Sequence, residues 1–122
     1  MAAVKEERIG SSKTMRALAF WHAVNASSLR KMPLDLSSRQ NAVLLSVYLA
    51  GQLHSIKTLS EELAISKPAI CRAIDTLEKA KLVKRVRDKG DKRNVYLQRT
   101  VKGSVYLSEF ADIILSKLKE AA

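Results

Sequence analysis

The sequence has few of the residues on which many structural and catalytic sites depend. It contains one cysteine, two prolines, four glycines and six aromatic side chains in 122 residues. The lone cysteine, Cys71, excludes a disulfide within the chain and is typical of proteins from reducing compartments. No apolar run approaches the roughly 20 residues that cross a bilayer, and the first residues lack the apolar core of a secretion signal. We therefore expect a cytoplasmic protein without a membrane partner.

Patterns typical of enzymes and metal sites are also missing. The chain has no glycine-rich phosphate loop and no Ser-His-Asp order. Among His22, His54 and Cys71, no two share the spacing of metal ligands. Asp75 and Glu78 lie among lysines, which is more typical of surface ion pairs than of a general acid and base. We therefore predict no enzyme activity, no metal and no cofactor.

Positive charge is what the chain has in excess, with a net charge of +10. Between Lys81 and Lys102 nine cations and two anions contribute +7 of this, on fewer than a quarter of the residues. Charge concentrated in this way favours a polyanionic partner. A helix that binds anionic membranes carries its cations along the flank of one apolar face. These cations fall mainly in a strand–turn–strand pattern, so duplex DNA is the simpler partner.

The length and the apolar content of 47% predict one globular domain over residues 13–122, after a polar tail at residues 1–12 that we expect to be disordered. A first helix is predicted over Lys13–Arg30, capped by Thr14 or Ser12. A last helix follows Thr100 and runs to about Lys119. Both helices carry apolar residues on more than one face, which predicts either a central place in the core or contact with a second subunit.

The second predicted helix begins at Ser37, where Gln40 completes a capping-box pattern, and ends near Gly51. His54–Ile56 is a candidate for a very short strand. The helix has the composition of a core element, with apolar or aromatic side chains at Leu44, Leu45, Val47, Tyr48 and Leu49.

A helix-turn-helix is predicted next. Thr58–Glu61 has a capping-box pattern and opens a short helix that ends around Ala64. Ser66 caps the following helix and would accept a hydrogen bond from the Ala69 amide, since Pro68 has none to offer. The buried stripe of this second helix is expected at Ile70, Ile74 and Leu77.

Two strands are predicted after the helix-turn-helix, over residues 82–87 and 94–99. The six residues 88–93 form the turn between them. Gly90 lies in this turn at a position that can take a positive φ.

From Leu63 to Gly103 the sequence resembles the MarR family of bacterial transcription regulators. Residues 66–78 resemble the recognition helix of the family and residues 82–85 its first wing strand. Asp91-Lys92-Arg93 is similar to the Asp-x-Arg signature at the wing tip, and residues 100–103 to the Thr-x-x-Gly that precedes the next helix.

The resemblance implies a mainly α winged helix-turn-helix fold with a small β-wing. It further implies a homodimer held by its first and last helices, residues 13–32 and 101–119, with DNA binding by residues 54–100. The partner would be double-stranded DNA with a pseudo-palindromic operator. The residues expected in the dimer contact are Leu18, Trp21, Phe110, Ile114 and Leu118.

The first turn of the recognition helix is expected to enter the major groove. Ser66 and Lys67 suit phosphates or base edges, and Pro68 or Ala69 could touch a thymine methyl group. Arg72 is long enough for a bidentate contact with guanine. It could equally pair with Asp75 on a solvated helix face.

The wing is expected to bind the backbone and the minor groove. Arg93 would enter a narrow minor groove. Asp91 would hold Arg93 or Arg85 in place, or would only form the turn. Expected phosphate contacts are Arg87, Lys89 and Lys92 in the wing and Lys57 and Thr58 before it.

These features predict a dimeric, sequence-specific DNA-binding regulator, more in keeping with a repressor than an activator, near the nucleoid if the source is bacterial. An adaptor that uses the same fold for protein contacts is the alternative. Binding of RNA or single strands is disfavoured, because Tyr96 is the one aromatic residue in the basic hairpin. Redox sensing by Cys71 lacks a second cysteine to resolve it. The sequence indicates neither an operator nor an effector.

Overall fold

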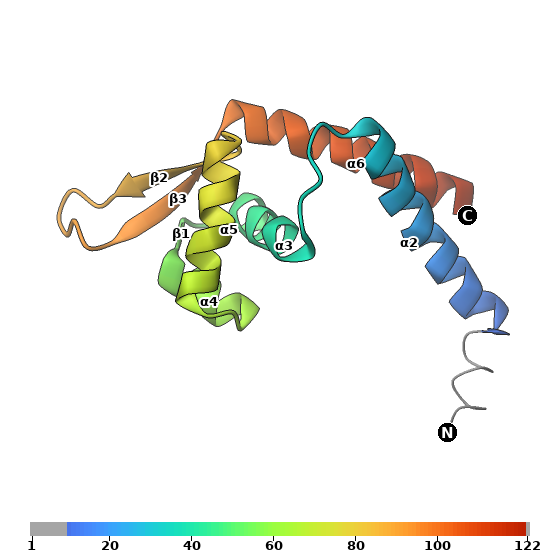
Figure 1. Cartoon of the computed structure of the whole chain (residues 1–122), viewed down its shortest axis with the longest axis horizontal. Coiled ribbons are helices and arrows are strands. Elements are labelled where there is room, and N and C mark those ends of the chain that lie inside the picture. The colour runs from blue at the N-terminus through green and yellow to red at the C-terminus, as the bar shows by residue number, and fades with distance from the viewer. Residues whose placement is uncertain (1–9, 122) are drawn as a thin grey trace, which may run out of the picture. The chain divides into compact units, whose positions relative to one another are not determined.

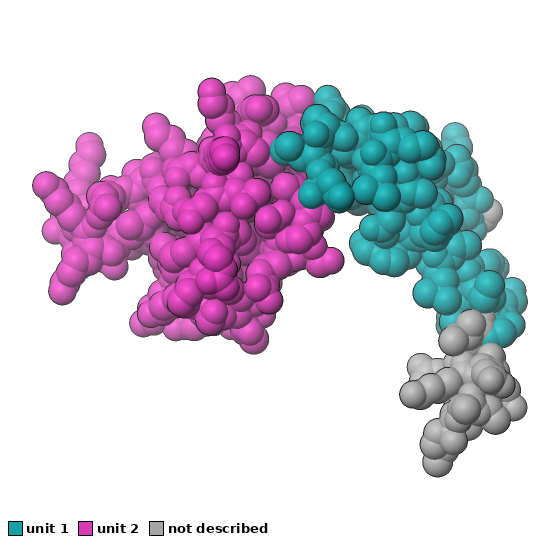
Figure 2. Space-filling model, in the orientation of Figure 1, with its two compact units in different colours: residues 1–35, 108–122 teal, residues 36–107 magenta. Residues whose placement is uncertain are grey.

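The structure, a computed structural model, describes residues 10–121. Contacts divide the chain into two compact units, residues 36–107 and residues 1–35 with 108–122 (Figure 2). The predicted tail at residues 1–12 falls largely on residues 1–9, which lie outside the described residues. The elements, in chain order (Figure 1), are α2 (Ser12–Lys31), α3 (Ser38–Leu49), β1 (His54–Ser55), α4 (Ile56–Leu63), α5 (Lys67–Lys79), β2 (Val83–Arg87), β3 (Val95–Arg99) and α6 (Val101–Ala121).

The unit of residues 36–107 is built on three helices and a small sheet. Helix α3 contacts α4, α5 and β3, so this unit begins with α3, whereas the predicted DNA-binding segment began at residue 54. The predicted stripe on α5 is confirmed, since Ile70, Ile74 and Leu77 are fully buried. Other fully buried side chains are Val43, Leu44, Leu59, Leu82, Val83 and Leu97.

Helix α3 matches its predicted start but not its predicted burial. The capping box at Ser37 and Gln40 is present in both directions, with the Gln40 amide donating to Ser37 Oγ. Leu44 and Val47 are buried as expected. Leu45 and Leu49 are exposed, because they share the opposite face of the helix.

The helix-turn-helix begins earlier than predicted. Ser55, not Thr58, caps α4, and Thr58 occupies the third helical position of the capping box. The predicted cap at Thr58 was therefore wrong, and Ile56 belongs to α4 and not to the strand. At the other end of the turn, Ser66 caps α5 and accepts from the Ala69 amide at 3.3 Å, as predicted.

The three strands form an antiparallel sheet in the order β1-β3-β2. Strands β2 and β3 confirm the predicted wing to within one residue at each start. Gly90 in the turn between them does not use the positive φ that is open to glycine. Its N–H instead donates to Asp88 Oδ1 at 2.9 Å, which closes the turn through a side chain. A positive φ of 64° is found before the wing, at Lys81.

The wing and α6 are joined through Tyr48 of α3. Its hydroxyl donates to the Leu82 carbonyl at 2.7 Å and accepts from the Thr100 amide at 2.9 Å. Thr100 Oγ1 accepts from the Gly103 amide, which confirms the predicted cap of the last helix. Gly103 lies so close to the Tyr48 hydroxyl and to the Leu82 carbonyl that a Cβ atom at this position would overlap both. The winged helix-turn-helix fold predicted above is therefore observed, mainly α with a small β-wing.

The other unit contains α2 and the part of α6 from Ser108 onward. Helix α2 begins at Ser12 and is capped by Ser11, not by Thr14 or Ser12. Val24 and Ile113 are buried in this unit. Four of the five residues predicted for the dimer contact are exposed, namely Leu18, Trp21, Ile114 and Leu118, while Phe110 is half-buried.

No helix within residues 10–121 combines the length and the apolar character that crossing a bilayer requires.

Candidate nucleic-acid interface

The first turn of α5 presents polar side chains to solvent. Ser66, Lys67 and Pro68 are exposed, and one turn further along so is Arg72. Ala69 is only 5% exposed, because it lies on the same side as the buried stripe. The thymine contact considered for Pro68 or Ala69 is therefore open to Pro68 alone.

Arg72 and Asp75 do not form the ion pair considered from the sequence. Asp75 Oδ1 instead accepts from Arg85 Nη2 of strand β2 at 2.6 Å. The Arg72 guanidinium has no hydrogen-bond or ion-pair partner among residues 10–121. Its five donors are thus available to a ligand outside the chain.

Arg85 connects the wing to the recognition helix. Its Nη1 donates to Glu78 Oε1 at 2.6 Å, and its backbone N–H donates to the other Glu78 oxygen at 3.0 Å. First this backbone N–H and then the guanidinium lower the pKa of Glu78 below its usual value of 4.5. Together with the bond to Asp75, these contacts join the first strand of the wing to the outward face of α5.

The wing tip holds a second arginine–carboxylate pair. Asp91 Oδ1 accepts from Arg93 Nε at 3.1 Å, and Asp91 Oδ2 accepts from Arg93 Nη2 at 3.2 Å. The side chain of Arg93, followed by its backbone N–H, lowers the pKa of the Asp91 carboxyl. Asp91 also forms the turn, since its carbonyl accepts from the Asn94 amide at 3.0 Å. Asp91 therefore pairs with Arg93 and not with Arg85, and it takes part in the turn as well.

The remaining cations of the wing differ in whether they contact other groups of the chain. Arg87 donates from Nη1 to the Lys92 carbonyl at 3.0 Å, which ties the two sides of the turn together. The ammonium groups of Lys89 and Lys92 are exposed, and neither has an ion-pair partner among the described residues. The Arg93 side chain is 91% exposed beside them.

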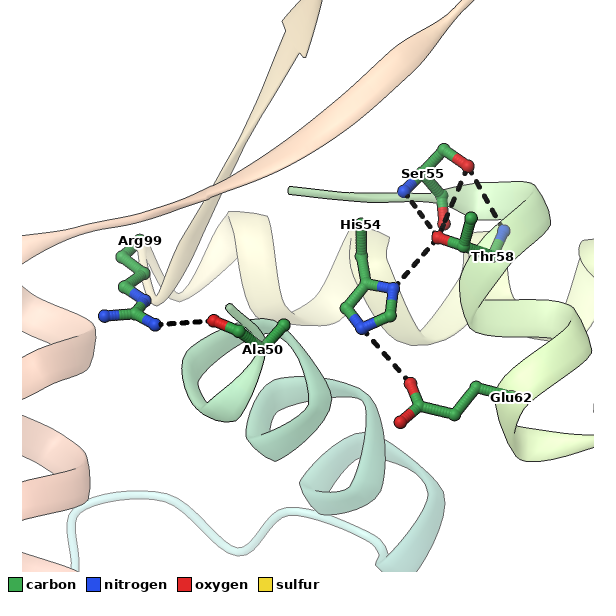
Figure 3. Close-up of polar contacts among 6 residues, drawn as sticks. All are labelled: Ala50, His54, Ser55, Thr58, Glu62 and Arg99. Carbon is green, nitrogen blue, oxygen red and sulfur yellow. Dashed lines mark hydrogen bonds and ion pairs between the residues drawn. The ribbon is translucent and has the colours of Figure 1, made fainter. Parts of the chain in front are cut away.

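The start of α4 uses its polar groups within the chain (Figure 3). Thr58 Oγ1 accepts from the Ser55 amide at 2.8 Å and lies 2.9 Å from His54 Nδ1. On its other side the His54 ring lies 3.2 Å from a Glu62 oxygen. The hydroxyl of Thr58 is therefore engaged internally, whereas Lys57 next to it is exposed.

The sequence reading did not select Arg85 as an interface residue. Asp75 and Glu78 are three residues apart on a predicted helix, which places two carboxylates on one face. That spacing, followed by an arginine on the next strand, is a signal that could have indicated a shared cation between helix and wing.

The match to a family model decides the classification. Residues 34–94, half of the chain, match the model of the MarR family. The chain belongs to the MarR family. Its MarR-family segment includes α3, the helix-turn-helix and the wing as far as Asn94. None of the curated proteins compared with it is a significant match.

Solved structures similar to this MarR-family chain show the same fold. The YusO protein from Bacillus subtilis is 19% identical, with a TM-score of 0.76 over 98% of this chain and 82% of that chain. A mutant of MepR from S. aureus bound to an oligodeoxyribonucleotide is 19% identical, with a TM-score of 0.76 over 87% of this chain and 75% of that one. A mutant of MarR from E. coli complexed with operator DNA is 23% identical, with a TM-score of 0.67 over 93% and 79%.

Proposed function

We propose that this chain is a sequence-specific regulator of transcription that binds duplex DNA as a homodimer. The observation that carries the proposal is a recognition helix joined through Arg85 to a basic wing that ends in Arg93. The Arg72 side chain on this helix is exposed and has no partner among residues 10–121. Helix α5 enters the major groove, and the wing tip enters the adjacent minor groove. The DNA complexes of MepR and MarR, which share this fold, support the proposal.

The contacts are divided between base edges and phosphates. Arg72 reads a base edge, and Pro68 touches a thymine methyl group. Arg93 enters the minor groove, oriented by Asp91. Phosphates are bound by side chains that are exposed along the helix and the wing, namely Lys57, Ser66, Lys67, Arg87, Lys89 and Lys92. Buried Ala69 and the engaged hydroxyl of Thr58 take no part.

The dimer forms through α2 and the end of α6. Trp21 on α2 and Leu118 on α6 are 61% and 54% exposed. Large apolar side chains that are exposed in this way favour contact with another protein surface. A second copy that covers them gives the assembly a two-fold axis, and a two-fold axis requires a pseudo-palindromic operator. Such a dimer acts most simply as a repressor in the cytoplasm, at the nucleoid, without catalysis.

A titration of duplex DNA at two salt concentrations tests the proposal. Arg72→Ala should weaken binding to the preferred sequence by roughly 1–3 kcal/mol and relax the choice of base at one position. Lys92→Ala should weaken binding to all sequences alike and reduce the salt slope by about 1. Arg30→Ala, a charge change on exposed α2, serves as the control. If the parent protein has no affinity for duplexes at low salt, the proposal fails and the adaptor function takes its place.

A further inference from the structure

His54 lies where the base of the wing meets the helix-turn-helix. Strand β1 pairs with β3 of the wing, with His54 opposite Leu97, and α4 follows directly after Ser55. Helix α4 packs in turn against the recognition helix α5. The His54 side chain is 13% exposed, so it is held between these elements. A change of charge on its ring therefore acts on the contact that joins the wing to the first helix of the helix-turn-helix.

Both ring nitrogens of His54 face polar groups of α4 (Figure 3). Nδ1 lies 2.9 Å from Thr58 Oγ1, and Nε2 lies 3.2 Å from a Glu62 oxygen. Since a carboxylate only accepts hydrogen bonds, Nε2 must carry a proton to bond to it. Thr58 Oγ1 accepts from the Ser55 amide at 2.8 Å and donates its one proton to the Ser55 carbonyl at 3.0 Å. Nδ1 is then a donor as well, and a ring that donates from both nitrogens is positively charged.

The neutral ring fits the same place less well. With its one proton on Nε2 it keeps a bond to Glu62 but loses the charge that strengthens this bond. Nδ1 then accepts from the Thr58 hydroxyl, which gives up the Ser55 carbonyl. With the proton on Nδ1, a bare nitrogen faces the carboxylate. Protonation therefore strengthens the contact between β1 and α4, and the imidazole ring is the side-chain group that ordinarily changes its charge between about pH 5 and 8.

Charged groups from two elements act on the ring. Glu62 of α4 favours a positive charge by direct contact. Arg99 opposes it from β3, two residues beyond Leu97 on the same face of the sheet, although its guanidinium is bonded to a backbone carbonyl at 3.2 Å. The N-terminus of α4 opposes it too. Other titratable side chains of the neighbouring elements make no hydrogen bond or ion pair with the ring within residues 10–121, namely Lys57 and Glu61 of α4, Arg39 and Tyr48 of α3 and Tyr96 of β3. The charge on His54 thus depends on Glu62.

We propose that His54 and Glu62 form a pH-sensitive latch that holds the helix-turn-helix against the base of the wing. In acid the charged ring bonds to Thr58 and Glu62 together, and at alkaline pH this link is weaker. The inference rests on the proposed DNA binding, because the latch fixes two elements that hold one duplex, and it adds pH as a regulator. Duplex binding is tighter with the latch formed, since elements fixed in advance lose less entropy on binding.

Urea unfolding of Glu62→Gln at two pH values tests the pair. A charged imidazole and an ionised carboxylate ordinarily exist together between about pH 4.3 and 6.5. The stability from the pair is therefore present in acid and is lost as the pH rises. Relative to the parent, Glu62→Gln should lose roughly 0.3–0.5 M in the urea midpoint at about pH 5.5 and much less at about pH 8. Glu61→Gln, which removes a neighbouring exposed carboxylate, is the matched control. An equal loss for Glu62→Gln at both pH values would overturn the latch.

Nitrogen NMR of the imidazole ring reports where the protons lie. The chain has two histidines, so His22→Asn, a change at an exposed position of α2, leaves the signals of His54 alone. Both nitrogens of His54 should carry protons at about pH 5.5, and Nε2 alone at about pH 8. A neutral ring with its proton on Nδ1 would contradict the bond to Glu62.

Duplex binding at the same two pH values tests the regulation. The gain in affinity from about pH 8 to about pH 5.5 should be roughly two-fold smaller per subunit for Glu62→Gln than for Glu61→Gln, because both variants lose one negative charge and only one of them loses the latch. Equal gains for the two variants would show that the latch does not regulate binding. If the parent binds no duplex at either pH, the DNA-binding proposal fails, and the unfolding and NMR measurements still decide whether the latch exists.

Discussion

Replacing Arg85 by methionine should show how much the link between wing and recognition helix contributes to stability. Methionine keeps an unbranched apolar stem and removes two charge-assisted hydrogen bonds, both 2.6 Å long. Such bonds contribute about 1.5–3 kcal/mol each when shielded, and exposed ion pairs about 0–1 kcal/mol. The Arg85 side chain is 29% exposed and that of Glu78 is 37% exposed, between these limits.

We therefore expect Arg85→Met to lower the free energy of unfolding by about 1–2 kcal/mol, or roughly 0.5–1 M in the urea midpoint for a protein of this size. Double-mutant cycles with Glu78→Gln and with Asp75→Asn divide this loss between the two partners. The coupling to Glu78 should be larger, because Asp75 is 65% exposed and does not bond to the backbone. An Arg85→Met protein that unfolds at the urea concentration of the parent would refute this reasoning.

The pH dependence of the free energy of unfolding is a second test of the ion pair between Arg85 and Glu78. The pKa of Glu78 in the folded protein is lowered, so its ionised form binds Arg85. A lowered pKa means that the unfolded chain binds the proton more readily, and stability from this pair is complete above the usual value of 4.5. The stability that this pair contributes is lost as the pH falls through the lowered pKa of Glu78 in the folded state. The difference in free energy of unfolding between the parent and Glu78→Gln should therefore disappear at acid pH. A difference that stays constant as the pH falls would contradict the ion pair between Glu78 and Arg85.

Two further changes test the fold and the assembly. Gly103→Ala should lower the free energy of unfolding in urea by about 1–3 kcal/mol, because the new methyl group overlaps the Tyr48 hydroxyl and the Leu82 carbonyl. Ser104→Ala, an exposed position in the same helical turn, is the control. A Gly103→Ala protein that is more stable than the parent would contradict the close contact. Trp21→Glu should convert the proposed dimer to monomers in sedimentation velocity while the helical circular dichroism stays unchanged, and a dimer of unaltered affinity would remove Trp21 from the interface.

The sequence alone determined the features that depend on neighbours three or four residues apart. The starts of α3 and α5 follow from Ser37 with Gln40 and from Ser66 with the Ala69 amide, and such local bonds are readable in the order of residues. The buried stripe of α5 and the two wing strands follow from apolar periodicity for the same reason. Even here a local ambiguity misled the reading. Ser55 and Thr58 are both good caps. The pairing of β1 with β3, in which Ser55 lies opposite Tyr96, places the start of α4 at the first of them.

Only the tertiary structure decided which charged groups meet. The sequence offered two arginines, Arg85 and Arg93, as partners of Asp91. Arg85 does not pair with Asp91, because it bonds instead to Glu78 and Asp75 on helix α5. Arg39 and Arg72 are 33 residues apart and line one groove because α3 packs against α5. Long, flexible side chains have many possible partners of opposite charge along a chain. Which of these becomes real depends on how the backbone brings distant segments together, and that is a property of packing and not of residue order.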